Sequence, residues 1–283
     1  MPPFFIMINT LIKLFILASL SLITFGCKHY VQFGKPTSTP EVQGLELKTI
    51  EIEGFNLTTY QRIANTTANI HVYIEGDGNA WVTPTQPSND PTPKYALMLK
   101  LAELDRSPNV VYMARPCQFS KSTSPKCHVD YWTDKRFSLD MIRVMNNAIN
   151  RFKTQGSQQK LELIGYSGGG AIAAILSARR KDVVNLRTIA GNLDHEYVNK
   201  YHHVSQLEGS VNAMSFAFNL TQLPQLHFIA ENDEIVPEEV VKRFISGQNG
   251  ECANSVMIKN TTHTEGWEGL WIKLLNAPVK CAD

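Results

Sequence analysis

The sequence has no excess of charge of either sign. Its 283 residues include 27 Lys and Arg against 26 Asp and Glu, which gives a formal net charge of +1. No run of basic residues breaks this balance, so the sequence gives no electrostatic reason to expect nucleic-acid binding. Internal repeats and long low-complexity tracts are also absent. A chain of this length can bury a large core as one domain.

The sequence also lacks an uninterrupted apolar run long enough to span a bilayer. Lys13 precedes a charge-free run at 14–25, which is shorter than the ~20 residues that a spanning helix needs. Only when residues 4–8 are added across Lys13 does a membrane-spanning helix become an alternative. A basic residue, about a dozen apolar residues and then Gly26 predict a signal peptide at 1–26. If translation started at Met7, the chain would begin with a more ordinary signal peptide.

The end of this segment, Ile23-Thr-Phe-Gly-Cys27, resembles the processing site of bacterial lipoproteins, with Thr24 where an aliphatic residue is usual. The resemblance implies that Cys27 is lipidated and becomes the mature N-terminus. Residues 27–44 would then form a lipidated end and a polar tether. We expect an exported protein attached through Cys27 to the bacterial cell envelope, favouring the outer membrane on its periplasmic or surface side. Plain secretion and an uncleaved anchor are the alternatives.

Cysteine is scarce, and no C-x-x-C pair of the kind that favours zinc is present. Once Cys27 is set aside, four cysteines remain, and an even number in an exported chain favours disulfides. The sequence-local pairing joins Cys117 to Cys127 and Cys252 to Cys281. Three connectivities are open on the sequence alone, and buried free thiols are a further alternative. We expect no metal and no organic cofactor.

Strand-like and helix-like segments alternate along the rest of the chain. This alternation predicts an α/β fold with a mostly parallel sheet and helices on both faces. Ligands of such sheets bind at the carboxyl ends of the strands. Strands are expected at 45–52, 58–64, 70–74, 109–114, 161–166, 184–190, 226–230 and 255–258, and helices at 95–104, 138–152, 168–180, 237–245 and 267–275.

The most informative motif is Gly165-Tyr-Ser167-Gly-Gly169, which lies between an apolar strand pattern and an Ala-rich helix pattern. A strand, a sharp turn and a helix in this order raise the serine hydroxyl above the sheet. The start of the helix also directs free N–H groups and its dipole at the same place. Ser167 is therefore the candidate nucleophile. The alternative is a serine in an ordinary Gly-rich turn.

A serine nucleophile needs a base, and His263 is the candidate because it follows the last predicted strand. That position opens at the same edge of the sheet as Ser167. His71 and His227 lie within predicted strands and are better explained as structural side chains. The other histidines of the predicted domain are His128, His195, His202 and His203.

The base in turn needs a carboxylate that orients its ring. Asp233 follows the penultimate strand and is the first candidate, although an Asp before Pro237 can also be a helix cap. Asp194 is the second candidate, and Glu231 and Glu234 are weaker ones.

The order Ser167, Asp233, His263 resembles that of the α/β-hydrolase superfamily over residues 65–275, within a predicted domain at 45–283. In that family a loop with His-Gly after an early strand contributes a main-chain N–H to the oxyanion hole. The matching segment here is Glu75-Gly-Asp77-Gly78, with Glu75 in place of the histidine. The resemblance places the donors at Asp77, or Gly78 as an alternative, and at Gly168. An ordinary β-turn is the other explanation of this segment.

The resemblance implies a serine hydrolase of the carboxylesterase or lipase type. It would cleave an ester, thioester or amide of a small-molecule acyl substrate through an acyl-enzyme on Ser167. A non-catalytic surface lipoprotein with this fold and an acyltransferase are the alternatives. Residues 115–137 and 194–223 are expected to shape the pocket, the second as a small lid. Tyr131, Trp132, Trp81 and Trp267 fit packing and substrate contact equally well.

Overall fold

The computed structural model describes residues 40–154 and 156–281, and the structural statements below concern these residues. The predicted signal peptide, Cys27 and most of the tether at 27–44 lie outside them. No helix within the described ranges is both long and apolar enough to cross a lipid bilayer.

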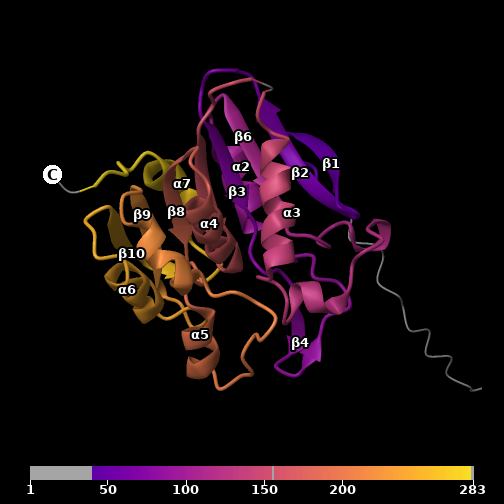
Figure 1. The fold of residues 1–283 in the computed structure, drawn as a ribbon, viewed down its shortest axis with the longest axis vertical. Coiled ribbons are helices and arrows are strands. Elements are labelled where there is room, and N and C mark those ends of the chain that lie inside the picture. The colour runs from indigo at the N-terminus through magenta and orange to yellow at the C-terminus, as the bar shows by residue number, and fades with distance from the viewer. Residues whose placement is uncertain (1–39, 155, 282–283) are drawn as a thin grey trace, which may run out of the picture. The chain divides into compact units, whose positions relative to one another are not determined.

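Eight strands form one sheet (Figure 1): β1 (Glu46–Ile52), β2 (Phe55–Ile63), β3 (Ile70–Ile74), β6 (Asn109–Met113), β7 (Leu161–Tyr166), β8 (Val183–Ile189), β9 (Gln225–Asn232) and β10 (Ala253–Thr262). Their order across the sheet is β1-β2-β6-β3-β7-β8-β9-β10. Strand β2 runs antiparallel to β1 and β6, and all pairs from β6 to β10 are parallel. The mostly parallel sheet that the alternation predicts is therefore confirmed.

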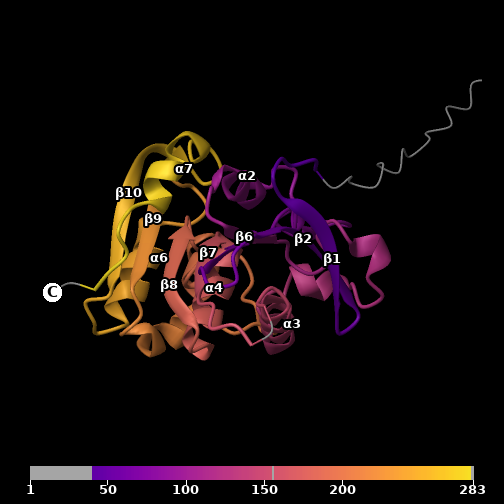
Figure 2. The ribbon, with the colours of Figure 1, turned by 90° about the horizontal axis from the view of Figure 1, so that it is seen from above.

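Helices cover both faces of this sheet (Figure 2). One face carries α2 (Leu97–Leu104) and α7 (Glu268–Leu275), and the other carries α3 (Leu139–Asn150), α4 (Gly168–Arg179) and α6 (Glu238–Ser246). The predicted cap of α3 is present, because the Ser138 hydroxyl accepts a hydrogen bond from the main-chain N–H of Met141 at 3.3 Å.

The two helical layers create two apolar cores. Successive strand residues point to opposite faces of a sheet. Val72 and Ile74 of β3 therefore pack in the core that contains α3 and α4, whereas Tyr73 packs in the core that contains α2 and α7. The second core includes the edge-on contact between Tyr73 and Trp271.

Several short helices and strands lie in the loops between the main elements, and the sequence does not predict them. Helix α5 begins after Asp194, whose carboxylate accepts a hydrogen bond from the N–H of Tyr197 at 3.2 Å. These elements are too short to show a clear periodicity. They are α5 (His195–Tyr201), the hairpin strands β4 (Trp81–Thr83) and β5 (Gln86–Pro87), and the 3₁₀ helices η1 (Lys121–Thr123), η2 (Val129–Trp132) and η3 (Ala213–Leu220).

Two disulfides follow the sequence-local pairing. One joins Cys117 to Cys127 and closes the loop after β6, and the other joins Cys252 to Cys281 near the end of the chain. The second bond holds the C-terminal segment against the start of β10, as the sequence predicts.

Helix α4 lies unusually close to the ends of strands β3 and β7. A Cβ atom on Gly169 would lie 2.3 Å from the carbonyl oxygen of Ile74 and 2.4 Å from that of Glu75. A Cβ atom on Gly165 would lie 2.3 Å from the carbonyl oxygen of Gly169. Because backbone carbonyls cannot move aside as a flexible side chain can, both positions require glycine.

We therefore expect Gly169→Ala to lower the free energy of unfolding by about 3 kcal/mol or more, as overpacking against backbone does. Gly269→Ala is the matched control, because Gly269 is exposed in α7 and a Cβ there would meet nothing within 4 Å. The control should raise the free energy of unfolding by up to ~1 kcal/mol through helix propensity. Denaturant unfolding of both variants measures this, and equal stabilities would contradict the close contact.

Candidate active site

Ser167 occupies the sharp turn between β7 and α4. Its backbone has φ 51° and ψ −123°, a conformation that a non-glycine residue rarely adopts. Hydrogen bonds hold it there: the Ser167 N–H donates to the carbonyl of Ile189 at 3.0 Å, and the Ser167 carbonyl accepts from the N–H groups of Gly170 and Asn192, each at 2.9 Å. The strained turn places the half-buried hydroxyl above the carboxyl edge of the sheet.

The structure brings Ser167, His263 and Asp233 into one chain of hydrogen bonds. His263 Nε2 lies 3.1 Å from Ser167 Oγ, and His263 Nδ1 lies 3.0 Å and 2.9 Å from the two carboxylate oxygens of Asp233. A carboxylate only accepts hydrogen bonds, so Nδ1 carries the proton. The unprotonated Nε2 can then accept the proton of the serine hydroxyl.

The Asp233 carboxylate is itself fixed by the backbone. Its Oδ1 accepts hydrogen bonds from the N–H groups of Ile235 at 2.9 Å and Val236 at 2.8 Å. The side chain is almost fully buried against His263. These bonds orient the carboxylate, and through it the imidazole ring.

The alternative acids and bases lie in other contacts. Asp194 caps α5 and accepts hydrogen bonds from Asn212 at 2.8 Å and Arg243 at 3.2 Å. Glu231 accepts a hydrogen bond from the main-chain N–H of Asn260. The ring of His71 bonds Asp105 at 2.7 Å, and that of His227 bonds Thr188 at 2.8 Å. None of these contacts leads to Ser167.

Asp77 and Gly168 lie beside the hydroxyl, where the sequence predicts the oxyanion donors. A Cβ on Gly168 would lie 2.0 Å from Oδ1 of Asp77, so the two residues are in direct contact. The main-chain N–H groups of Asp77 and Gly168 donate to no acceptor within the described ranges. The N–H of Gly76, just before Asp77, donates instead to the carboxyl group of Glu75. Free main-chain N–H groups of this kind are the donors that an oxyanion hole uses, so Asp77 and Gly168 stay the candidate donors.

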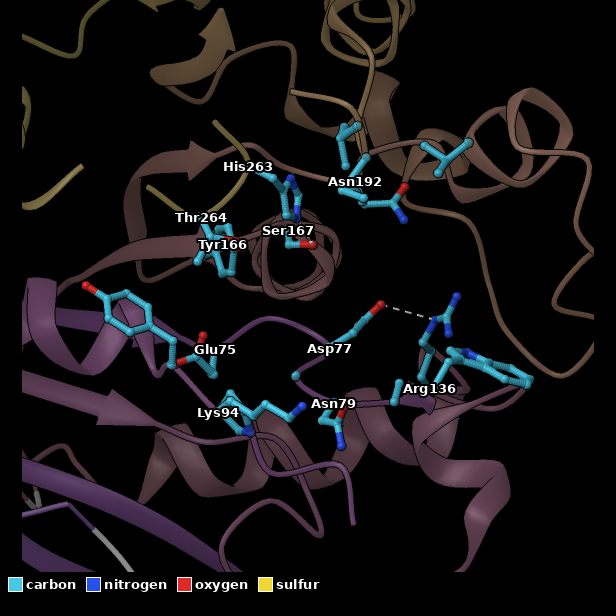
Figure 3. Close-up of a pocket in the computed structure, with 18 of the residues that line it drawn as sticks. Glu75, Asp77, Asn79, Lys94, Arg136, Tyr166, Ser167, Asn192, His263 and Thr264 are labelled. Carbon is cyan, nitrogen blue, oxygen red and sulfur yellow. Dashed lines mark hydrogen bonds and ion pairs between the residues drawn. The ribbon is translucent and has the colours of Figure 1, made fainter. Parts of the chain in front are cut away.

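Two arginines that the sequence reasoning missed hold the Asp77 carboxylate. Arg115 Nη1 lies 3.0 Å from Oδ1. Arg136 Nε lies 3.3 Å from Oδ2, the contact drawn as a dashed line in Figure 3. Arg115 also donates to the main-chain carbonyl of Arg136. Arg115 comes two residues after the end of β6, so its place at a strand's carboxyl end was a usable signal. Arg136 lies in a loop and gives no such signal.

A cavity of about 480 Å³ opens over the hydroxyl of Ser167. Its volume suits a small or medium-sized ligand. Trp81 lines the cavity, but Trp132 and Trp267 are buried and donate their indole N–H groups to backbone carbonyls, so these two serve packing. Tyr131 packs edge-on against Phe55. Within the described ranges, no group of three or more His, Cys, Asp and Glu side chains could hold a metal ion.

Comparison with known proteins identifies the fold. No family model matches the chain, and no curated protein matches its sequence. Est1E from Butyrivibrio proteoclasticus superposes with a TM-score of 0.56, covering 81% of this chain and 95% of its own at 12% sequence identity. An alpha-beta serine hydrolase homologue from Coxiella burnetii superposes with a TM-score of 0.55, covering 84% of this chain and 96% of its own at 18% sequence identity. A bacterial membrane phospholipase A superposes with a TM-score of 0.56, covering 82% of this chain and 85% of its own at 13% sequence identity. The chain has the α/β-hydrolase fold.

Glu75, which stands where the family resemblance implies a histidine, lines the cavity. Only 1% of its surface is exposed. Its carboxyl group accepts hydrogen bonds from the N–H of Gly76 at 3.0 Å and from the hydroxyl of Tyr112 at 3.2 Å. Burial raises the pKa of Glu75 to about 7, because a charged carboxylate is poorly solvated there.

This raised pKa predicts a pH dependence of stability. Between the ordinary pKa of 4.5 and the folded value of about 7, the folded state binds more protons than the unfolded state. The contribution of Glu75 to stability is therefore full below pH 4.5 and declines as the pH rises to about 7. Relative to Glu75→Gln, which cannot titrate, the wild type should lose on the order of 3 kcal/mol over this range.

Denaturant unfolding of both proteins at several pH values between 4 and 8 measures this difference. Glu208→Gln is the control, because Glu208 is an exposed carboxyl outside the cavity. A difference between wild type and Glu75→Gln that does not change with pH would show that the carboxyl is not held in its neutral form.

Proposed function

We propose that the protein is a serine hydrolase that cleaves an ester, thioester or amide of a small-molecule acyl substrate. The observation that carries the proposal is the hydrogen-bond chain from Asp233 through His263 to Ser167 at the apex of a strained strand–helix turn. A nucleophile, a base with the correct tautomer and an orienting acid are the groups that acyl transfer needs. The main-chain N–H groups of Asp77 and Gly168, which donate to no acceptor within the described ranges, are the proposed oxyanion donors.

In the proposed reaction, Ser167 Oγ attacks the acyl carbonyl while His263 Nε2 takes the hydroxyl proton. Asp233 stabilises the imidazolium that forms. The N–H groups of Asp77 and Gly168 accommodate the negative oxygen of the tetrahedral intermediate. His263 then gives its proton to the leaving group, which departs and leaves an acyl-enzyme on Ser167. Water, deprotonated by His263, releases the acid product and regenerates the serine.

Covalent labelling with a fluorophosphonate probe tests this proposal. The wild-type protein should form one adduct, which peptide mass spectrometry places on Ser167, and Ser167→Ala should form none. Asp233→Asn should slow labelling by about 10³–10⁴-fold, because the imidazole loses the acceptor that fixes its tautomer. Glu231→Gln is the matched control, since Glu231 lies on the same segment but, among the described residues, bonds only the backbone of Asn260.

An unlabelled Ser167 in the folded wild type would reject the hydrolase proposal and favour a non-catalytic role. Labelling that is equally fast in Asp233→Asn would reject the assigned acid. If the enzyme labels but transfers its acyl group to an added alcohol in preference to water, the protein is an acyltransferase.

We further propose that the protein is an exported lipoprotein attached to the cell envelope through Cys27. The support is the sequence at 13–27 and the two disulfides, because such bonds persist in oxidising compartments. Mass spectrometry of the purified protein should find a mature N-terminus at Cys27 with acyl chains, and Cys27→Ser should remove them. A mature chain that keeps residue 1, or an unmodified Cys27, would contradict this proposal.

A further inference from the structure

Positive charge exceeds negative charge at one wall of the cavity. Two guanidinium groups, those of Arg115 and Arg136, share the single carboxylate of Asp77. Neither arginine pairs with another carboxylate within the described ranges. The cluster therefore carries one uncompensated positive charge beside the candidate nucleophile.

The surplus charge is presented to the cavity by Arg136. Arg115 lies behind it, and its two Nη atoms are used by Asp77 and by the main-chain carbonyl of Arg136. Arg136 is only 8% exposed, and yet it lines the cavity. Its Nε atom is buried and forms no hydrogen bond, although it lies 3.3 Å from Oδ2 of Asp77 in an ion pair. Its Nη1 and Nη2 atoms donate to no acceptor within the described ranges, so they are available to an anion in the cavity.

A second buried polar group faces the same cavity. Asn192 is 6% exposed, and its main-chain N–H is fixed by the carbonyl of Ser167. Its Nδ2 group donates to no acceptor within the described ranges and can therefore donate to an anion, whereas the unpaired Oδ1 atom is itself an acceptor. Asn192, Arg136 and Ser167 all line this cavity, as Figure 3 shows. We call Arg136 and Asn192 together the anion subsite.

The carboxylate of Asp77 connects Arg136 of this subsite to the start of α4. The carboxylate of Asp77 touches Gly168, the residue after the nucleophile, with one oxygen and approaches Arg136 with the other. The single carboxylate of Asp77 therefore contacts both the start of α4 and the guanidinium group of Arg136. A ligand group bound by Arg136 would lie within a few atoms of the scissile carbonyl.

An apolar cavity continues from the anion subsite. It has a volume of about 680 Å³ and shares Trp81, Arg136, Asn199 and Ile235 with the first cavity. Val204 and Leu207 from the segment after α5 and Pro84 from the β4–β5 hairpin add apolar surface. The hairpin and α5 both contribute residues to its lining. An apolar substituent of a substrate fits this second cavity.

We propose that the substrate carries a carboxylate, which the anion subsite binds, and an apolar group that occupies the second cavity. The proposal rests on the hydrolase function proposed above and names its substrate class. A guanidinium group matches the planar geometry of a carboxylate through two parallel hydrogen bonds. A single surplus charge fits a monoanion better than the double charge of a phosphate monoester.

Calorimetric titration of the full chain carrying Ser167→Ala tests this subsite without turnover. The probes are 4-phenylbutanoate and its neutral amide, which differ only in charge. The carboxylate should bind about tenfold more tightly than the amide or better, as hydrogen bonds to a charged group do. Arg136→Gln should bring the two dissociation constants together, and Arg136→Lys should keep part of the difference.

Lys94→Gln is the matched control, since Lys94 also lines the cavity but is exposed. It should keep the preference for the carboxylate. Because Arg136→Gln could disturb folding through Asp77, Asn192→Asp is a second variant. It places a negative charge in the subsite and should weaken carboxylate binding while amide binding is retained.

No preference for the carboxylate, no measurable binding of it, or a preference lost in Lys94→Gln would each overturn the proposal. These results are separate from the labelling of Ser167. Labelling without carboxylate preference would keep the hydrolase and reject the anion subsite. Carboxylate preference without labelling would reject the hydrolase and leave Arg136 as part of a carboxylate-binding site.

Discussion

The close contact between helix α4 and the carboxyl ends of β3 and β7 is the constraint on which the site depends. It requires glycine at 165 and 169, because a side-chain atom at either position would overlap backbone. With the helix so near, the chain turns through a positive φ at Ser167. The hydroxyl then stands above the sheet, and the amide of Gly168 lies beside it. A looser contact would allow a relaxed turn, which would not direct these groups at one point.

The same contact decides where Asp77 lies. Its carboxylate packs against Gly168 at a distance that leaves no room for a Cβ atom. The carboxylate also meets Arg115 and Arg136, which come from the loop after β6 and the loop before α3. The loop that holds one candidate oxyanion donor is thus fixed from two sides, by packing against α4 and by two ion pairs. Movement of Asp77 would disturb both the donor and the arginine that faces the cavity.

Much of this arrangement could be predicted from the sequence, because its signals are local. Ser167 lies in a motif with flanking glycines, and Asp233 and His263 each follow a recognisable strand in a parallel sheet. Arg115 follows a strand and could have been singled out, but its pairing with Asp77 could not be predicted, because Arg115 lies 38 residues from Asp77 in the chain and Arg136 lies farther still. Nothing near either arginine indicates its partner. The choice of Asp233 over Asp194 also needed coordinates, since both follow strands and only contacts show that Asp194 caps α5.

The loop after β3 places two acidic side chains beside N–H groups that would have to stabilise a negative oxygen. Two carboxylates there would oppose that charge, and the structure neutralises them by different means. Glu75 is buried without a cation, so its proton is retained up to a pH of about 7. Asp77 is partly exposed and is balanced by guanidinium groups. Because two arginines balance the one carboxylate of Asp77, these ion pairs leave a surplus positive charge. The burial of a protonated Glu75 leaves none. Below a pH of about 7, a pocket with a neutral Glu75 and a surplus charge at Arg136 favours negative charge in both the oxyanion and a substituent of the substrate.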